Sequence, residues 1–282
     1  FRKKTPVVIV ENSAMAAVIT GGNKGIGFEV AKQLLAMPSS RRGFNELIIA
    51  CRNPKLGVEA AERLGCRYLP LDLNDEKSIE EFAVRLERDY GSLECLVNNA
   101  GIFYTNADPT PLNEVCEAVL RVNFFNTVLL TERLLPLLAK AKTPRIVNVA
   151  SGLGRLKQVP PKRQTEFSAD TVTLPAVKEL MQEFRSDVLA KRHHEKDWSN
   201  CDYSFVYSMS KLGLIAATRI FARENPMMRI NACCPGYCKT DMTKHQGHRA
   251  PEDGARNAVF CVLVEPDGFT GEMIEDEAIS TW

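Results

Sequence analysis

Short, nearly continuous runs of apolar residues alternate along the chain with stretches in which apolar residues recur every three or four positions. Runs of the first kind are typical of strands buried on both faces of a sheet, and the second pattern is typical of amphipathic helices. The predicted strands are 16–20, 46–51, 67–71, 93–100, 145–151, 229–235 and one near 269–274, and the predicted helices are 28–36, 74–91, 112–140, 207–223 and 251–263. This order predicts an α/β fold: a single doubly wound parallel sheet of about seven strands with helices on both faces.

One interval interrupts the alternation. Residues 152–206 separate a predicted strand from the next predicted helix, whereas such connections usually have about two to six residues. The interval contains an amphipathic helix with Thr173 as its cap and Pro175 in its first turn. Its apolar stripe, which needs a surface to cover, consists of Val177, Leu180, Met181, Phe184 and Val188.

The domain organisation follows from this pattern. We expect one domain over residues 15–282, with a helical insertion at 152–206 before the helix that follows it. Residues 1–14 precede Met15 and are interpreted as an N-terminal extension, in preference to an extra edge strand.

Composition narrows the choice of partner and compartment. Thirty-six basic and 35 acidic residues nearly cancel, so no net field directs the chain to nucleic acid or to an anionic membrane, and a small molecule is the expected partner. Nine cysteines without a C-x-x-C motif fit a reducing, cytoplasmic location better than a disulfide framework. The apolar run at residues 7–10 is too short for a signal-peptide core or a membrane span.

A glycine-rich motif, TGGNKGIG (20–27), follows the first predicted strand and opens the first predicted helix. Glycines permit a tight turn there, and free N–H groups at the helix N-terminus attract a pyrophosphate. The spacing differs from G-x-G-x-x-G, and a plain glycine-rich turn is the alternative interpretation. Its position between strand and helix favours a dinucleotide-binding, Rossmann-type fold. The residues expected to hold the cofactor are Gly21, Asn23, Lys24, Gly25, Ile26 and Gly27.

The end of the second predicted strand, ACRN (50–53), bears on the choice of cofactor. A carboxylate at this place binds the adenosine ribose of NAD, whereas a cation suits the 2′-phosphate of NADP. Cys51 stands where the carboxylate would be, Arg52 follows, and Lys24 adds a second cation from the glycine loop. Solvated surface charges are the alternative interpretation; the position of the two cations favours NADP(H).

The stretch DYSFVYSMSK (202–211) places Tyr203, Tyr207 and Lys211 four residues apart, on one face of a helix. An ordinary helix stripe has the same spacing, so this motif alone is weak. A lysine ammonium one turn from a tyrosine would stabilise the phenolate and lower the tyrosine pKa from about 10.

Six motifs in order resemble the short-chain dehydrogenase/reductase family from about residue 15 to the C-terminus: the glycine loop, NNAG (98–101), VNFFNT (122–127), VNVAS (147–151), YSMSK (207–211) and CCPGYCKTDM (233–242). The chain is most similar to the monomeric, NADPH-dependent carbonyl reductases of that family, which have a long insertion at the place of residues 152–206.

The resemblance implies roles for individual residues. Tyr207 matches the catalytic acid/base, Lys211 its partner, Ser151 the catalytic serine and Asn123 the asparagine that holds a lysine-linked water relay, whereas Tyr203 has no counterpart. The cofactor contacts that the resemblance implies beyond the glycine loop and Arg52 are Asp72, Leu73, Asn99, Ala100, Gly101, Tyr207, Lys211, Pro235, Gly236, Cys238 and Thr240. Ala150 departs from the usual Ser-Ser pair, and Tyr237 is an aromatic substitution at the substrate side.

The activity that these roles imply is NADPH-dependent reduction of aldehydes, ketones or quinones by hydride transfer, with Tyr207 as proton donor, in a monomeric enzyme. Oxidation of a secondary alcohol and a narrow biosynthetic ketone reduction are the alternatives. A non-catalytic NADP sensor is disfavoured by the presence of Ser151, Tyr207 and Lys211. No metal is expected, because His245 and His248 lack a clear ligand set. Cys233 and Cys234 are expected to be buried.

Overall fold

The computed structural model describes residues 15–198 and 201–282, and the interpretation of residues 1–14 lies outside this part of the chain. Its strands form one sheet in the order β3-β2-β1-β4-β5-β6-β7-β8. The strands are β1 (Ala16–Thr20), β2 (Glu46–Cys51), β3 (Arg67–Pro70), β4 (Cys95–Asn98), β5 (Arg145–Val149), β6 (Arg229–Cys233), β7 (Met273–Glu275) and β8 (Ala278–Ser280). Neighbours pair in parallel except β7 and β8, so the predicted parallel sheet is confirmed and the short β8 hairpin arm adds an eighth strand.

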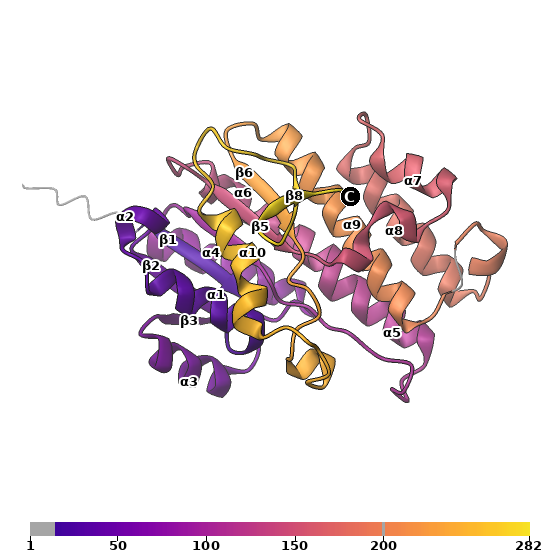
Figure 1. Cartoon of the computed structure of the whole chain (residues 1–282), viewed down its shortest axis with the longest axis horizontal. Helices are drawn as coiled ribbons and strands as arrows, with labels where there is room; N and C mark the ends of the chain where they lie inside the picture. Colours follow the sequence, from indigo (N-terminus) through magenta and orange to yellow (C-terminus); the bar gives the residue numbers. More distant parts are fainter. Residues whose placement is uncertain (1–14, 199–200) are drawn as a thin grey trace, which may run out of the picture.

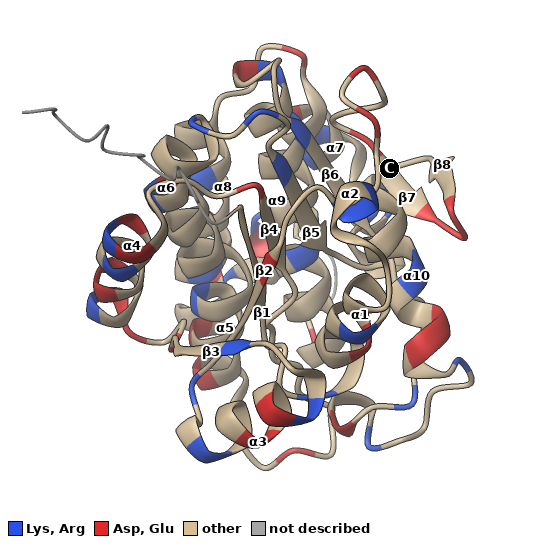
Figure 2. Cartoon of the chain, turned by 90° about the vertical axis from the view of Figure 1, so that its left-hand side faces the viewer, with Lys and Arg blue, Asp and Glu red and all other residues tan. Residues whose placement is uncertain are grey.

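Helices cover both faces of the sheet. They are α1 (Gly25–Leu35), α2 (Ser39–Arg42), α3 (Pro54–Leu64), α4 (Glu76–Tyr90), α5 (Leu112–Leu120), α6 (Asn126–Leu138), α7 (Pro161–Ser168), α8 (Leu174–Leu189), α9 (Tyr203–Glu224) and α10 (Pro251–Val262). Alternate residues of β1 enter different cores: Val18 packs with α4, α5, α6 and α9, and Ile19 packs with α1, α3 and α10. Figure 2 shows α4 and α6 on one side of the sheet and α1 and α10 on the other, with acidic and basic residues interspersed on α4.

The predicted 112–140 helix is interrupted by one wide turn. Residues Arg121–Phe125 form a π-helical turn between α5 and α6. Such turns often occur at functional sites. Asn123 lies in this turn and is 1% exposed, so the interruption belongs to the part of the chain predicted to carry chemistry.

The insertion forms α7 and α8 at the end of the molecule opposite β2 and β3 (Figure 1). The predicted cap is confirmed, since the Ala176 N–H donates to Thr173 Oγ1 at 3.4 Å. The predicted stripe of α8 packs against α5 and α9, with Val177, Met181 and Phe184 fully buried. Two ion pairs fasten the same helix, Arg185 with Glu117 of α5 at 2.5 Å and Lys178 with Glu132 of α6 at 2.7 Å. The insertion therefore covers the outer face of α5 and α9 within its own chain.

A chain of buried polar side chains links β4 and β5 to α6 and α9, on one face of the sheet, beneath the predicted site. Asn98 Nδ2 donates to Thr131 Oγ1 at 2.9 Å and to Asn148 Oδ1 at 2.8 Å. Asn148 Nδ2 in turn donates to Thr218 Oγ1 at 2.8 Å. Because a buried polar group without a partner costs about 1–3 kcal/mol, this network holds the ends of β4 and β5 in one position relative to α6 and α9.

Some element boundaries differ from the prediction. Helix α9 begins at Tyr203, four residues before the predicted start, because the Asp202 carboxylate caps it by accepting from the Phe205 N–H at 2.7 Å. Helix α3 had no predicted counterpart. In the described ranges, none of the helices combines the length and the apolar character needed to span a membrane.

Candidate active site

The predicted site residues gather at one edge of the sheet. The glycine loop follows β1, Asn99 follows β4, Ser151 follows β5 and Pro235 follows β6, all at the carboxyl ends of parallel strands. The strand order reverses between β1 and β4. Ligands of doubly wound proteins bind outside the carboxyl ends at such a reversal, so the edge is the candidate ligand site.

The glycine loop has the backbone and the space that a dinucleotide requires. Gly21 and Gly25 have φ of +65° and +57°, the left-handed region that favours glycine. A Cβ at Gly27 would lie 2.4 Å from Asn99 Nδ2 and 2.6 Å from Gly21 O. Lys24 is the N-cap of α1 and makes no side-chain capping bond, so no cap takes the N–H groups of the first turn. These groups are the donors to which a pyrophosphate binds, and the loop fits the predicted cofactor.

Thr20 and Asn99 join the glycine loop to the NNAG segment. Thr20 Oγ1 accepts from the N–H groups of Asn99 and Ala100, each at 3.0 Å. Asn99 Nδ2 donates to Thr20 O at 2.8 Å and to Gly21 O at 3.3 Å. The Asn99 side chain therefore holds the shape of the loop, which is a positioning role beside the predicted cofactor contact.

The adenosine side of the predicted site lies at the ends of β2 and β3. Cys51 is 8% exposed and its Sγ donates to Asn53 O at 3.4 Å, and burial raises the pKa of this thiol. Arg52 is exposed. Asp72 Oδ1 accepts from the Asn74 N–H at 2.9 Å, and Leu73 O accepts from Asn126 Nδ2 at 2.7 Å. Both predicted cofactor contacts, Asp72 and Leu73, are thus held by hydrogen bonds at the same edge.

Lys24 forms an ion pair with Asp241, a residue that was not predicted to have a role in the cofactor site. Its Nζ lies 2.6 Å from Asp241 Oδ2, and the side chains are 60% and 57% exposed. The hydrogen bond and charge of Lys24 hold the pKa of Asp241 below its usual value. His245 Nε2 lies 3.2 Å from the other Asp241 oxygen. A cation predicted to meet the 2′-phosphate is therefore shared with the segment that follows β6.

Four residues predicted to be catalytic come together at the floor of the site. Ser151 Oγ is a hydrogen-bond partner of Tyr207 and accepts from the Leu153 N–H at 3.2 Å. Lys211 is 4% exposed, its Nζ donates to Val149 O at 2.8 Å, and this atom lies 5.6 Å from the centroid of the Tyr207 ring. Ser151, Tyr207 and Lys211 thus form one connected group.

Asn123 lies beside this group and forms hydrogen bonds with Ile102 and Ser210. Its Oδ1 accepts from the Ile102 N–H at 2.8 Å, and its Nδ2 donates to Ile102 O at 2.9 Å and to Ser210 Oγ at 3.2 Å. A Cβ at Gly101 would lie 3.2 Å from Asn123 Oδ1 and 3.7 Å from Lys211 Nζ. The glycine therefore lets the NNAG backbone approach both side chains closely.

Burial sets the protonation of the tyrosine and the lysine. Burial raises the pKa of Tyr207, and the nearby Cys234 thiol raises it further, while the hydrogen bond with Ser151 lowers it. Burial also lowers the pKa of Lys211 to about 8, against the effect of the Cys233 and Cys234 thiols. The expected lowering of the Tyr207 pKa by Lys211 is not seen in the chain by itself, because desolvation of both groups outweighs it. At neutral pH Tyr207 carries its proton and Lys211 is largely cationic.

The segment after β6 is tied to the segment after β5. Cys234 Sγ accepts from the N–H groups of Gly152 at 3.1 Å and Gly236 at 3.3 Å. Cys238 is 2% exposed, and its Sγ donates to Pro235 O at 3.2 Å. Thr240 caps the short 3₁₀ turn Asp241–Thr243. Cys233 and Cys234 are 1% and 5% exposed, so their predicted burial is confirmed.

Two contacts of the α9 tyrosines, one aromatic and one hydrogen-bonded, were not foreseen. Phe103 meets Tyr207 edge to face, with ring centroids 5.0 Å apart and planes at 74°. The Tyr203 hydroxyl donates to Thr110 O at 2.7 Å. The helical spacing had shown that Tyr203 and Tyr207 share a face, but nothing in the spacing identified the partner of either ring.

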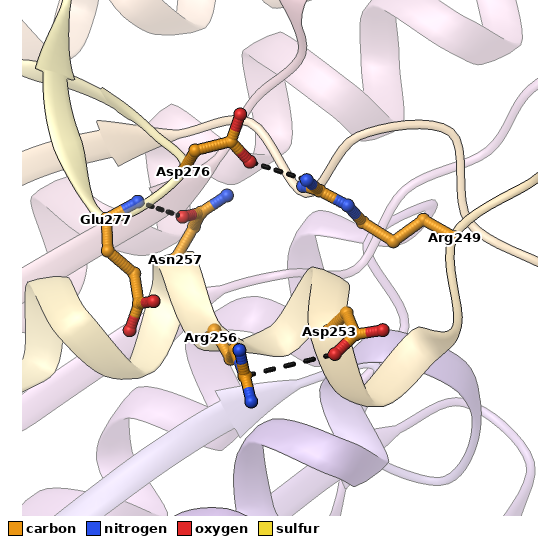
Figure 3. A pocket seen from close by; sticks show the side chains of 6 residues that line it. All are labelled: Arg249, Asp253, Arg256, Asn257, Asp276 and Glu277. Atoms are coloured by element: carbon orange, nitrogen blue, oxygen red, sulfur yellow. Dashed lines mark hydrogen bonds and ion pairs between the residues drawn. The ribbon is translucent and has the colours of Figure 1, made fainter.

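A separate hollow of about 230 Å³ lies between α10 and the β7–β8 turn (Figure 3). Four of its charged side chains form pairs, Arg249 with Asp276 at 2.5 Å and Arg256 with Asp253 at 3.9 Å. None of the residues that line it was predicted to be part of the site. Over the described ranges, no three His, Cys, Asp or Glu side chains gather in a way that could hold a metal ion.

Comparison with known proteins places this geometry in a family. The family model for short chain dehydrogenases matches residues 15–190. Carbonyl reductase (NADPH) 3 from Mus musculus is 35% identical over 288 aligned positions, which cover 97% of this chain and 100% of the relative. Carbonyl reductase (NADPH) 1 from Homo sapiens is 34% identical, with 94% and 98% covered.

Solved structures agree. Salutaridine reductase from Papaver somniferum superposes with a TM-score of 0.82 at 29% identity and covers 92% of this chain and 99% of its own. Menthone neomenthol reductase from Mentha piperita gives a TM-score of 0.76 at 28% identity, with 93% and 98% covered. The sheet order, the site at its carboxyl edge and these matches lead to one conclusion: the chain belongs to the short-chain dehydrogenase family.

Proposed function

We propose that this protein is an NADP-dependent short-chain oxidoreductase that reduces aldehydes, ketones or quinones to alcohols. The observation that carries the proposal is the connected group of Ser151, Tyr207 and Lys211 at the carboxyl edge of the sheet. Relatives named as NADPH carbonyl reductases, similar over nearly the whole chain, support it.

The residues of the edge fit an NADP cofactor. The N–H groups at the start of α1, with the Gly21–Gly27 turn, would hold the pyrophosphate. Arg52 and Lys24 would bind the 2′-phosphate, and no carboxylate at position 51 repels it. Asp72, Leu73 and Asn99 would line the adenosine, and the segment Pro235–Thr240 would lie against the nicotinamide. Bound NADPH supplies the hydride for the carbonyl carbon.

The side chains of the chain itself manage the proton. Tyr207 is protonated at neutral pH, so it can donate to the carbonyl oxygen. Ser151 can donate a hydrogen bond to the same oxygen as negative charge develops there, an effect typically worth about 3 kcal/mol. Lys211, cationic below a pKa of about 8, stabilises the phenolate that remains. Asn123 holds the Ile102 backbone beside this group and is proposed to hold a water that returns the proton.

A narrow ketone reduction is the second candidate. The two plant reductases that superpose over more than nine-tenths of this chain favour it. Oxidation of a secondary alcohol would use the same residues in reverse.

We also propose that the protein is monomeric and cytoplasmic. In dimeric members of the family the helices around the active-site tyrosine pack across a subunit interface, and here α8 covers that face of α5 and α9 within the same chain. All nine cysteines, each at a described position, are free, as a reducing compartment requires.

A binding titration and a substrate panel test the proposal. We expect NADPH to quench the fluorescence of the protein at lower concentration than NADH, and NADPH absorbance to fall when aldehydes, ketones and quinones are added. Consumption with several classes supports the broad reductase, and consumption with one ketone alone supports the narrow one. Tight NADPH binding without turnover over the whole panel would instead indicate a sensor.

A further inference from the structure

The segment between β4 and α5 is held at both ends beside Tyr207. At its start, Ile102 makes two backbone hydrogen bonds with the Asn123 side chain, at 2.8 and 2.9 Å. At its end, Thr110 O accepts from the Tyr203 hydroxyl at 2.7 Å. Asp108 stiffens the middle, because its N–H donates to Thr105 O and its carboxylate accepts from the Thr110 N–H. Segment 102–110 therefore has one preferred position relative to α9.

Phe103 differs from its neighbours on this segment. Ile102 and Tyr104 pack against the core on the α5 and α9 side of the sheet. The Phe103 ring contacts Tyr207 instead, at 5.0 Å between centroids, and like its two neighbours it is partly buried. The Phe103 ring thus packs on the proposed acid and not on the core, and part of its surface is open. A substrate that Tyr207 protonates can therefore contact this ring.

Resting on the proposed function, we propose that Phe103 is a specificity-determining residue that favours carbonyl groups attached to a flat, unsaturated ring, and that Tyr203 is the positioning residue of its segment. The carbonyl oxygen must reach the Tyr207 hydroxyl, so a substituent of the carbonyl carbon passes near the Phe103 ring. The contact between two aromatic rings contributes about 0.5–1.5 kcal/mol beyond the burial of their apolar area, which corresponds to about 2- to 12-fold in kcat/KM. Benzaldehyde and cyclohexanecarbaldehyde form a pair of similar size that differs in this property.

The test compares the benzaldehyde to cyclohexanecarbaldehyde ratio of kcat/KM in three proteins. Phe103→Leu should lower the ratio about 2- to 12-fold, mostly through a higher KM for benzaldehyde. Tyr104→Leu, which removes a neighbouring aromatic ring packed on the core, is the matched control and should leave the ratio unchanged. An unchanged ratio in Phe103→Leu, or equal changes in both variants, would overturn the assignment. Phe103→Met provides a second variant should the first fold poorly.

Tyr203→Phe tests the positioning role. It removes one hydrogen bond and no ring, so kcat for cyclohexanecarbaldehyde should stay within about twofold while KM for benzaldehyde rises severalfold, in line with the loss of one neutral bond. Proportional changes for the two aldehydes would refute a positioning role. If none of the carbonyl compounds causes the unaltered protein to consume NADPH, the proposed function is wrong, and this inference is wrong too. If the unaltered protein turns over normally but Phe103→Leu leaves the ratio unchanged, only the inference is wrong.

Discussion

The ion pair between Lys24 and Asp241 predicts that removing a negative charge strengthens NADPH binding. Lys24 is expected to meet the 2′-phosphate, yet its Nζ lies 2.6 Å from Asp241 Oδ2. To bind the phosphate, the Lys24 ammonium must break its ion pair with the Asp241 carboxylate or contact both anions at once. Asp241→Asn keeps the size of the side chain and removes the competing charge, so the full attraction of Lys24 becomes available to the cofactor.

The magnitude follows from exposure. Both side chains are more than half exposed, and exposed ion pairs are worth about 0.2–1 kcal/mol. Asp241→Asn should therefore tighten NADPH binding by about 1.4- to 5-fold. NADH lacks the 2′-phosphate, so its affinity should change little.

Fluorescence titrations of NADPH and NADH at low ionic strength measure the effect, and a double-mutant cycle isolates it. In the Lys24→Ala background, Asp241→Asn should no longer increase the NADPH affinity, because the competition has gone. Added salt should diminish the gain, since the charges are exposed. Weaker NADPH binding in Asp241→Asn, or an equal gain for NADH, would refute the assignment of Lys24 to the phosphate.

Three further predictions concern the second cation, the buried lysine and the insertion. Arg52→Ala should reduce the NADPH over NADH preference by about 10-fold, the loss of one charge-assisted bond at an exposed site, and unaltered preference in titrations would contradict this. Burial lowers the Lys211 pKa to about 8 from 10.5, so between these values the unfolded chain binds more protons at this residue, and the contribution of Lys211 to the free energy of unfolding should rise with pH, by at most about 3 kcal/mol. Buried thiols such as Cys51 and the Tyr207 hydroxyl, whose pKa values are raised, act in the opposite direction. In urea unfolding from pH 7.5 to 10, the slope of stability against pH should therefore be more positive in the unaltered protein than in Lys211→Met, and equal slopes would argue against it. Phe184→Ala, at a fully buried position of α8, should lower the free energy of unfolding by about 3–5 kcal/mol, and Leu189→Ala, at 42% exposure, by less than about 0.5 kcal/mol. Light scattering of the unaltered protein should report a monomer, and a stable dimer would contradict the proposed role of α8.

Sequence predicted the sheet well because its central strands are buried on both faces and therefore read as continuous apolar runs. It missed α3 for a related reason. The buried residues of that helix are Gly57, Ala60 and Ala61, whereas its larger apolar side chains Leu56 and Val58 are exposed, so the apolar residues of the sequence do not mark the buried face. The Asn53 cap and Pro54 at the helix start were the available signals.

The site was predictable as a set of motifs and less so as a network. Ser151, Tyr207 and Lys211 lie together as expected, since strand ends and one helix face fix them. Lys24 and Asp241 are 217 residues apart on two loops, and no local spacing reports such a pair. The raised pKa of Tyr207 and the Phe103 contact depend on tertiary burial, which periodicity does not measure.

The central claim is that Tyr207 supplies the proton for carbonyl reduction, and Tyr207→Phe tests it most directly. The decisive measurement is steady-state NADPH oxidation with a carbonyl substrate, accompanied by an NADPH titration of the same preparation. Because the substitution removes the hydroxyl and keeps the ring, the account predicts NADPH affinity within about twofold of the unaltered protein and a loss of turnover of at least about 100-fold. Turnover by Tyr207→Phe at a rate near that of the unaltered protein, with cofactor bound, would contradict it.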